Sequence, residues 1–120
     1  MDADELKQRT KKFALRIIKL VESLPKTKTG DVIGRQLLRC GTSVGANYRS
    51  ACRARSKADF ISKAGIAIEE ADETIYWMEL LIEGNLISEQ MSEQLLKEAN
   101  ELTAILTASV ITARKNLQKS

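Results

Sequence analysis

Hydrophobic side chains recur three or four positions apart in four stretches of the chain, which is the spacing of one face of an α-helix. The first stretch has Leu6, Phe13, Ile17, Leu20 and Leu24, and the second has Ile33, Leu37, Cys40, Val44, Tyr48 and Ala51. The third stretch has Phe60, Ala64, Ala67, Ala71, Ile75, Met78 and Ile82. The fourth stretch has Met91, Leu95, Leu102, Ile105, Ala113 and Leu117. The pattern predicts four amphipathic helices.

Capping signals set the limits of these helices. Pro25 cannot continue the first helix, because it lacks a backbone N–H and clashes with the preceding turn. Ser56 and Ser88 are good N-caps for the third and fourth helices. Gly84 and Asn85 tolerate the left-handed turn that closes the third helix.

The joints between the helices are therefore predicted at residues 25–30, 54–56 and 84–87. Joints this short make neighbouring helices antiparallel. Residues 1–120 are predicted to form a single all-α domain, an up-and-down antiparallel four-helix bundle with helices of about 20–27 residues.

Composition excludes several classes of protein. The chain has no histidine, so Ser-His and Cys-His nucleophile pairs and Glu-x-x-His metal sites are excluded, and no metal or cofactor is expected. The acidic N-terminus is unlike a secretory signal, and no apolar run approaches the roughly 18 residues of a membrane span. Cys40 and Cys52 lie too far around one helix to form a disulfide, which indicates a reducing compartment. We expect a cytoplasmic protein that is not an enzyme.

Charge is distributed unevenly along the sequence. The formal net charge is +3, but residues 1–63 carry fifteen Lys/Arg and six Asp/Glu, whereas residues 64–120 carry four and ten. This asymmetry has two interpretations: an anionic partner binds the basic half, or basic helices pack beside acidic ones within the fold.

Four arginines form a row on the second predicted helix. Arg35, Arg39, Arg49 and Arg53 lie within about 80° of one another around an unbroken helix, opposite its apolar stripe. Guanidinium groups arranged in this way suit phosphate oxygens, so the row is a candidate nucleic-acid contact. The alternatives are a solvated face, or ion pairs with the acidic third helix or with another subunit. No aromatic residue interleaves with the row, so base stacking is not supported.

A second group of residues is a candidate for helix packing or a subunit interface. Gly41 and Gly45 lie on one side of the second helix, where each costs about 1 kcal/mol relative to alanine unless another backbone approaches closely. Asn47 belongs to the same segment. Tyr76 and Trp77 are expected to anchor packing, with their polar groups at a polar margin.

Three segments give the chain a family resemblance. They are Gly34-Arg-Gln-Leu-Leu-Arg-Cys-Gly-Thr-Ser-Val-Gly-Ala-Asn-Tyr-Arg49, Asp59-Phe-Ile-Ser-Lys63 and Ile66-Ala-Ile-Glu-Glu-Ala-Asp-Glu-Thr-Ile-Tyr-Trp-Met-Glu-Leu-Leu81. Together they resemble the four helix bundle proteins first named for open reading frames in intervening sequences of 23S ribosomal RNA genes. The resemblance covers nearly the whole chain. Three places in the sequence depart from the family's pattern: Cys40 replaces the usual serine, Ser50 replaces an acidic residue, and Ala64-Gly65 replaces a bulkier apolar pair.

The resemblance implies a bundle that assembles into a homopentameric ring, without an established reaction. Relatives that accompany reverse transcriptases in diversity-generating retroelements form similar basic rings, so RNA, DNA and a reverse transcriptase are the implied partners. Carried over to this sequence, Arg39, Arg49 and Arg35 become the basic contacts. Two hypotheses follow: an oligomeric bundle that binds RNA or DNA through a basic surface, or a protein-protein interaction scaffold whose arginines serve subunit ion pairs.

Overall fold

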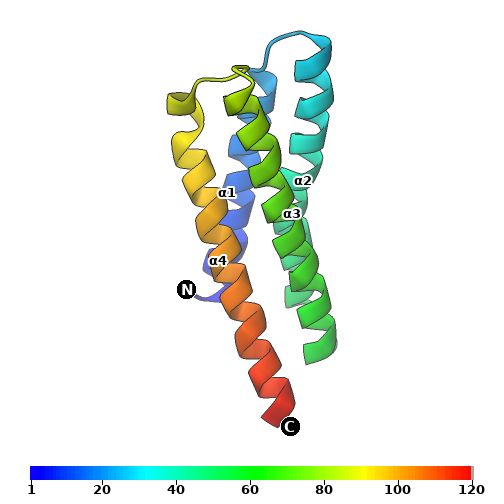
Figure 1. Cartoon of the computed structure of the whole chain (residues 1–120). Coiled ribbons are helices and arrows are strands. Elements are labelled where there is room, and N and C mark those ends of the chain that lie inside the picture. Colours follow the sequence, from blue (N-terminus) through cyan, green and yellow to red (C-terminus); the bar gives the residue numbers. More distant parts are fainter. Residues whose placement is uncertain (120) are drawn as a thin grey trace.

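The computed structural model describes residues 1–119, and within them the chain forms the four predicted helices. They are α1 (Ala3–Glu22), α2 (Lys28–Cys52), α3 (Lys57–Glu83) and α4 (Glu89–Lys119). Successive helices run in opposite directions and form an elongated bundle with extents of 52 × 21 × 20 Å (Figure 1). The predicted all-α bundle is confirmed.

The helix starts are explained by side chains that accept hydrogen bonds from the first turn. Ser56 accepts from the Asp59 N–H at 3.0 Å, and Ser88 accepts from the Met91 N–H at 3.1 Å, as their positions predicted. Thr27 does the same at the start of α2, so this helix begins before the predicted joint has ended. At the end of α3 it is Asn85, with φ of 61°, that adopts the left-handed conformation.

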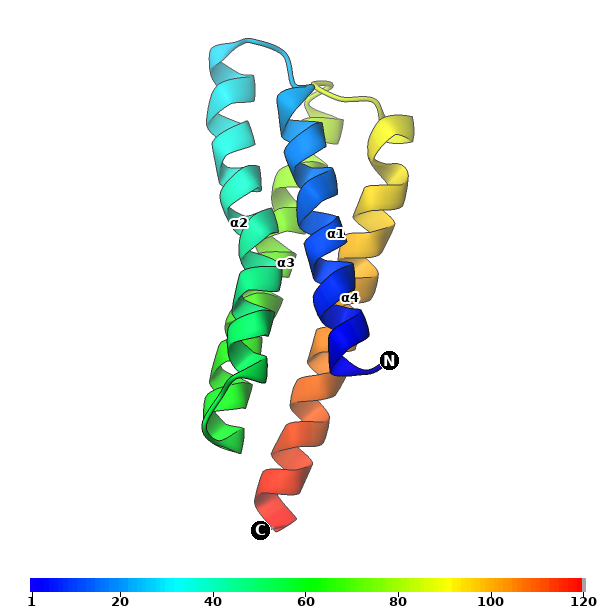
Figure 2. The ribbon, with the colours of Figure 1, turned by 180° about the vertical axis from the view of Figure 1, so that it is seen from behind.

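The helices differ in length, and this shapes one end of the bundle. α1 has 20 residues, whereas α4 has 31, more than predicted, since residues 89–119 contain no Gly or Pro to stop it. α4 therefore extends past the beginning of α1, and at that end only α2, α3 and α4 pack together (Figures 1 and 2). A separate small apolar cluster of Ala51, Ala64 and Val110 fills this three-helix end.

The main core lies where all four helices run side by side. Its fully buried side chains include Phe13 and Ile17 of α1, Leu37 of α2, Met78 of α3 and Leu102 of α4. Each comes from the predicted apolar stripe of its helix. No helix within residues 1–119 combines the length and the hydropathy needed to cross a membrane.

The two thiols occupy different environments, which leads to a test of the packing. Cys40 has no exposed surface, accepts a hydrogen bond from the Thr74 hydroxyl at 3.2 Å, and has its pKa raised to about 11 by burial. Cys52 is half-buried. With the thiol reagent DTNB we expect one fast-reacting thiol per native chain, absent in Cys52→Ser, and a second that reacts only on unfolding. Two equally fast thiols in the native protein would contradict this packing.

Candidate nucleic-acid interface

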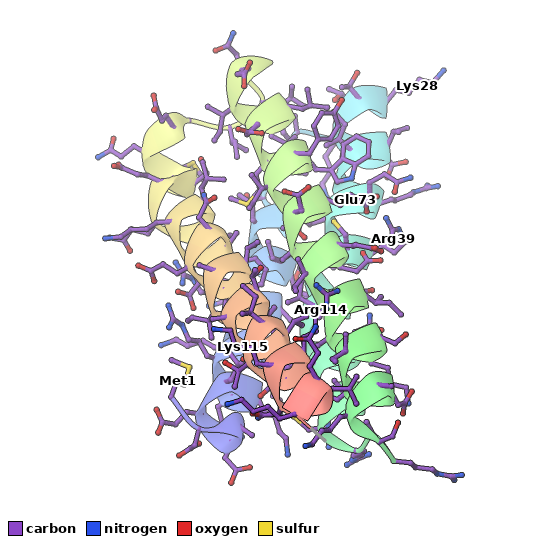
Figure 3. The ribbon with its side chains drawn as sticks, turned by 60° about the horizontal axis from the view of Figure 1, so that its bottom comes forward. Met1, Lys28, Arg39, Glu73, Arg114 and Lys115 are labelled. Atoms are coloured by element: carbon purple, nitrogen blue, oxygen red, sulfur yellow. The ribbon has the colours of Figure 1, made fainter. Side chains whose placement is uncertain are left out.

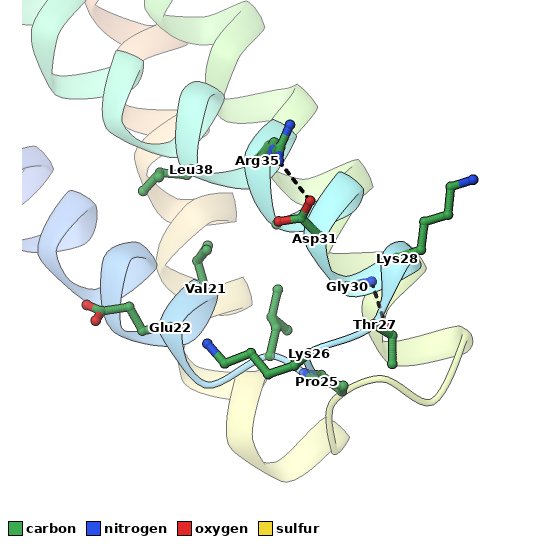
Figure 4. Close-up of a pocket in the computed structure, with 12 residues that line it drawn as sticks. Val21, Glu22, Pro25, Lys26, Thr27, Lys28, Gly30, Asp31, Arg35 and Leu38 are labelled. Carbon is green, nitrogen blue, oxygen red and sulfur yellow. Dashed lines mark hydrogen bonds and ion pairs between the residues drawn. The ribbon is translucent and has the colours of Figure 1, made fainter.

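The arginine row predicted on α2 does not form one free surface, because two of its members already have acidic partners. Arg35 pairs with Asp31 one turn earlier at 2.9 Å, beside the α1–α2 joint (Figure 4). Arg39 reaches across to α3, where it pairs with Glu70 at 3.2 Å and with Glu73 (Figure 3). The predicted ion pairs between α2 and the acidic helix are thus confirmed for Glu70 and Glu73.

The other two arginines of the row lie on the side of α2 that faces α1. Arg49 and Arg53 line a recess of about 410 Å³ together with Lys7 and Lys11 of α1. Within residues 1–119 neither arginine forms an ion pair. We call this recess the α1–α2 groove, and among the described residues only Lys7 of its four cations has an acidic partner, Asp4 at 3.6 Å.

Positive charge is concentrated at the three-helix end of the bundle. Residues 46–63 and 104–119, which meet there, carry eight Lys/Arg and one Asp/Glu, and we call this region the basic end (Figures 1 and 2). The cations are Arg49, Arg53, Arg55, Lys57, Lys63, Arg114, Lys115 and Lys119. Among the described residues only Lys63 of this group forms an ion pair, with Asp59 at 3.3 Å. Figure 3, which brings this end forward, shows Arg114 and Lys115 on α4.

Negative charge is concentrated on the remainder of α3 and α4. Residues 64–103 carry ten Asp/Glu and one Lys. Some of these acids form ion pairs with Arg9 and Arg39. In this part of the bundle, basic helices therefore pack beside acidic ones, which is the second of the two interpretations of the charge asymmetry. This interpretation does not describe residues 46–63 and 104–119, whose one acid is Asp59, although the acidic start of α1 lies nearby, with Ala3 lining a recess together with Arg55 and Lys57.

Arg9 joins α1 to α4 through two carboxylates that the sequence did not point to. Its Nε and Nη2 donate to the two oxygens of Glu98 at 2.7 and 2.6 Å, and Nη2 also donates to Glu101 at 2.6 Å. The hydrogen bond from Arg9 holds the pKa of the Glu98 carboxyl below its ordinary value, and the same bond raises the pKa of Arg9. This cluster stabilises the fold and leaves Arg9 no role at the surface.

The glycines of α2 lie at the contact with α1 inside one chain. A Cβ on Gly41 would lie 2.8 Å from the Ile17 side chain, and one on Gly45 would lie 3.1 Å from Thr10. The Asn47 amide donates to a backbone carbonyl one turn earlier at 2.8 Å. These three residues are thus engaged within the chain, and the two glycines let α1 and α2 approach closely.

Tyr76 and Trp77 form an edge-to-face pair with ring centroids 5.3 Å apart. Tyr76 is 53% exposed. Trp77 packs against the core, but its Nε1–H is buried and has no hydrogen-bond acceptor within residues 1–119, so it does not lie at the polar margin that was expected.

No metal centre is indicated by the described part of the chain. Within residues 1–119 no three His, Cys, Asp or Glu side chains are grouped closely enough to hold an ion. The acids of α3 that came closest to such a pattern, Glu70 and Glu73, share Arg39 instead.

Sequence reasoning missed the cations that α1 and α4 contribute to this region. Lys7 and Lys11 were part of a general excess of lysine on α1, and Arg114 and Lys115 were not singled out. A usable signal was present, because antiparallel helices bring the end of α2, the start of α3 and the end of α4 to one end. Counting charge by end of the bundle, rather than by half of the sequence, would have found them.

Comparisons with known proteins agree with this fold. A comparison with curated proteins gave no significant match. The crystal structure of a protein of unknown function from the S23 ribosomal protein family of Bacteroides thetaiotaomicron has a similar fold, with a TM-score of 0.83 and 40% identity over 88% of this chain and 97% of that one. The family model described as 23S rRNA-intervening sequence protein matches residues 4–108, which include all of α2 and α3. With most of its length matched, this chain belongs to the 23S rRNA-intervening sequence protein family.

Proposed function

We propose that this protein is a non-enzymatic, cytoplasmic homo-oligomer that binds RNA or DNA, without sequence preference, through its basic end. The observation that carries the proposal is the set of eight Lys/Arg at this end, of which only Lys63 is paired among the described residues. The acids at the nearby start of α1 form no ion pair with any of the eight within residues 1–119. Clustered cations without acidic partners attract phosphates and release the counterions bound to them. A pentamer is the assembly that the resemblance implies.

The test is fluorescence anisotropy of labelled RNA and DNA over a salt series. We expect affinity to fall steeply with salt, and Arg55→Gln/Lys57→Gln to reduce the slope of log affinity against log salt by about 2, or about 1 for each phosphate that is no longer neutralised. Both residues are exposed at the basic end, Arg55 in the joint and Lys57 at the first position of α3. The matched control is Lys26→Gln/Lys28→Gln, in the joint at the opposite end, which should leave the slope unchanged.

Absence of salt-sensitive binding at low salt would rule out this function. Equal effects of the two double substitutions would show that net charge alone is responsible and that the basic end has no special part. Arg39 is unsuitable for this test, since its ion pairs with Glu70 and Glu73 would make a substitution disturb the fold.

A protein-interaction scaffold is the second candidate, and one observation favours it. The acidic stretch of residues 64–103 offers a surface of opposite charge to which the basic end of a second copy or another polypeptide could pair. On this hypothesis Arg49→Glu disrupts the oligomer in size-exclusion chromatography. On the first hypothesis it leaves the size unchanged and weakens nucleic-acid binding.

A further inference from the structure

We propose that the α1–α2 groove binds the phosphodiester backbone of a nucleic acid through its phosphates and does not contact the bases. This proposal rests on the proposed function. The groove shares Arg49 and Arg53 with the basic end, and its cations come from two consecutive helices, α1 and α2, which lie side by side in Figure 2.

The arrangement of charge follows from helix geometry. Lys7 and Lys11 are one turn apart on α1, and Arg49 and Arg53 are one turn apart on α2, so each wall presents two cations about 6 Å apart along the groove. A chain of phosphates lying between the walls therefore meets cations at successive positions on both sides. Within residues 1–119, the one acid paired with any of the four is Asp4, 3.6 Å from Lys7, and its side chain is 93% exposed, so it competes weakly.

The floor of the groove is small, and apart from the exposed amide of Gln8 on α1, the uncharged residues that line the groove offer no group suited to reading bases. Gly45 and Ala46 form the floor, and because glycine has no side chain and alanine only a methyl group, the recess stays open above them. A Cβ on Gly45 would lie 3.1 Å from Thr10. The Thr10 and Thr42 hydroxyls donate to backbone carbonyls of their own helices, at 3.0 and 2.7 Å, and are not free to donate to base edges. No aromatic side chain lines the groove, so there is no platform on which a base could stack.

Another recess lies at the α1–α2 joint, and its chemistry is less suitable for this ligand. It has a volume of about 590 Å³ and is lined by Lys26, Lys28 and Arg35, but Glu22 and Asp31 lie beside them (Figure 4). Asp31 already pairs with Arg35. The two acids offset most of the attraction that the three cations exert on a polyanion.

The first experiment separates the groove from general positive charge. Ala46 is exposed on the floor, and Ala46→Leu fills the recess without changing the net charge. We expect it to lower the affinity for a labelled 20-nucleotide strand about tenfold, because the backbone can no longer reach the cations on both walls. Gln94→Leu, at a likewise exposed position on α4 outside both the groove and the basic end, is the matched control and should change affinity less than twofold.

A second variant and a second ligand test the two parts of the proposal independently. Lys11→Gln/Arg49→Gln should lower affinity at least fivefold more than Arg55→Gln/Lys57→Gln, which removes the same charge at the basic end outside the groove. A strand of the same length built entirely of abasic nucleotides should displace the labelled strand within about threefold of the normal strand, since only phosphates are bound.

Each outcome decides a separate point. If Ala46→Leu and Lys11→Gln/Arg49→Gln bind no worse than their controls while Arg55→Gln/Lys57→Gln still flattens the salt dependence, the groove proposal is overturned and the proposed function stands. A tenfold weaker abasic competitor would show that bases are contacted and would also overturn it. No binding by the unmodified protein at low salt would overturn both.

Discussion

Replacing Gly41 by valine is expected to lower the free energy of unfolding by about 3 kcal/mol, the upper end of the usual cost of overpacking a core. A Cβ at this position would lie 2.8 Å from the Cγ2 of Ile17, a branched side chain with no exposed surface and no space to move into. Valine improves slightly on glycine in helix propensity, but by less than about 1 kcal/mol. Urea denaturation followed by circular dichroism measures the change.

Gly65 provides the matched control, since it is also inside a helix. A Cβ there would have no other atom within 4 Å, so Gly65→Val should alter stability by about 0.5 kcal/mol or less. Shortening the Ile17 side chain should relieve the clash that Gly41→Val creates. Ile17→Ala combined with Gly41→Val should cost at least about 1 kcal/mol less than the sum of the two single changes. Additive costs would show that the two helices do not depend on this contact.

The helices themselves could be predicted because their signals are local. Apolar spacing, Pro25, Ser56 and Ser88 each act within one or two turns, and each was confirmed in its predicted place. The start of α2 was placed too late, because Thr27 was not recognised as an N-cap. The length of α4 was underestimated, because helices of about 20–27 residues were expected and residues 89–119 contain no Gly or Pro to end a helix at that length.

The candidate site could be predicted only in part, because its geometry depends on which helix lies on each side of α2. From the sequence alone, Arg39 and Arg49 were equivalent members of one row, and Arg39 was a natural choice for mutagenesis. In the fold, Arg39 pairs with Glu70 and Glu73 of α3, whereas Arg49 lines a recess together with Lys7 and Lys11 of α1. Neighbours across a bundle are set by tertiary packing, which the spacing along one helix does not report.

Arg9 is another residue whose partners are set by tertiary packing and could not be predicted from the sequence. Its replacement is the second substitution that we expect to lower the stability of the fold strongly. Arg9 was one of several cations on the first predicted helix, yet its guanidinium provides every ion pair that joins α1 to α4 within residues 1–119. The Glu98 side chain that it contacts is only 15% exposed. Replacing Arg9 by methionine keeps the apolar stem but leaves this carboxylate without its partner, which should cost about 2 kcal/mol at pH 7.

The control for Arg9→Met is Arg35→Met, which removes an ion pair between side chains that are 78% and 60% exposed. Exposed pairs of this kind contribute little, so the expected cost is below about 1 kcal/mol. Equal losses of stability in the two variants would contradict the special role of the partly buried Arg9–Glu98 pair.

The stability that Arg9 confers is also expected to depend on pH. Because the hydrogen bond from Arg9 lowers the pKa of Glu98, the unfolded chain takes up the proton more readily than the folded one. The stabilisation is therefore complete well above the ordinary value of 4.5 and disappears as the pH falls through the lowered native pKa. Urea denaturation at pH 7 and at pH 3 should show the unmodified protein and Arg9→Met converging in acid. A difference that stays constant down to pH 3 would show that the effect of Arg9 does not depend on the ionised Glu98 carboxylate, whereas convergence assigns the effect to the charged pair.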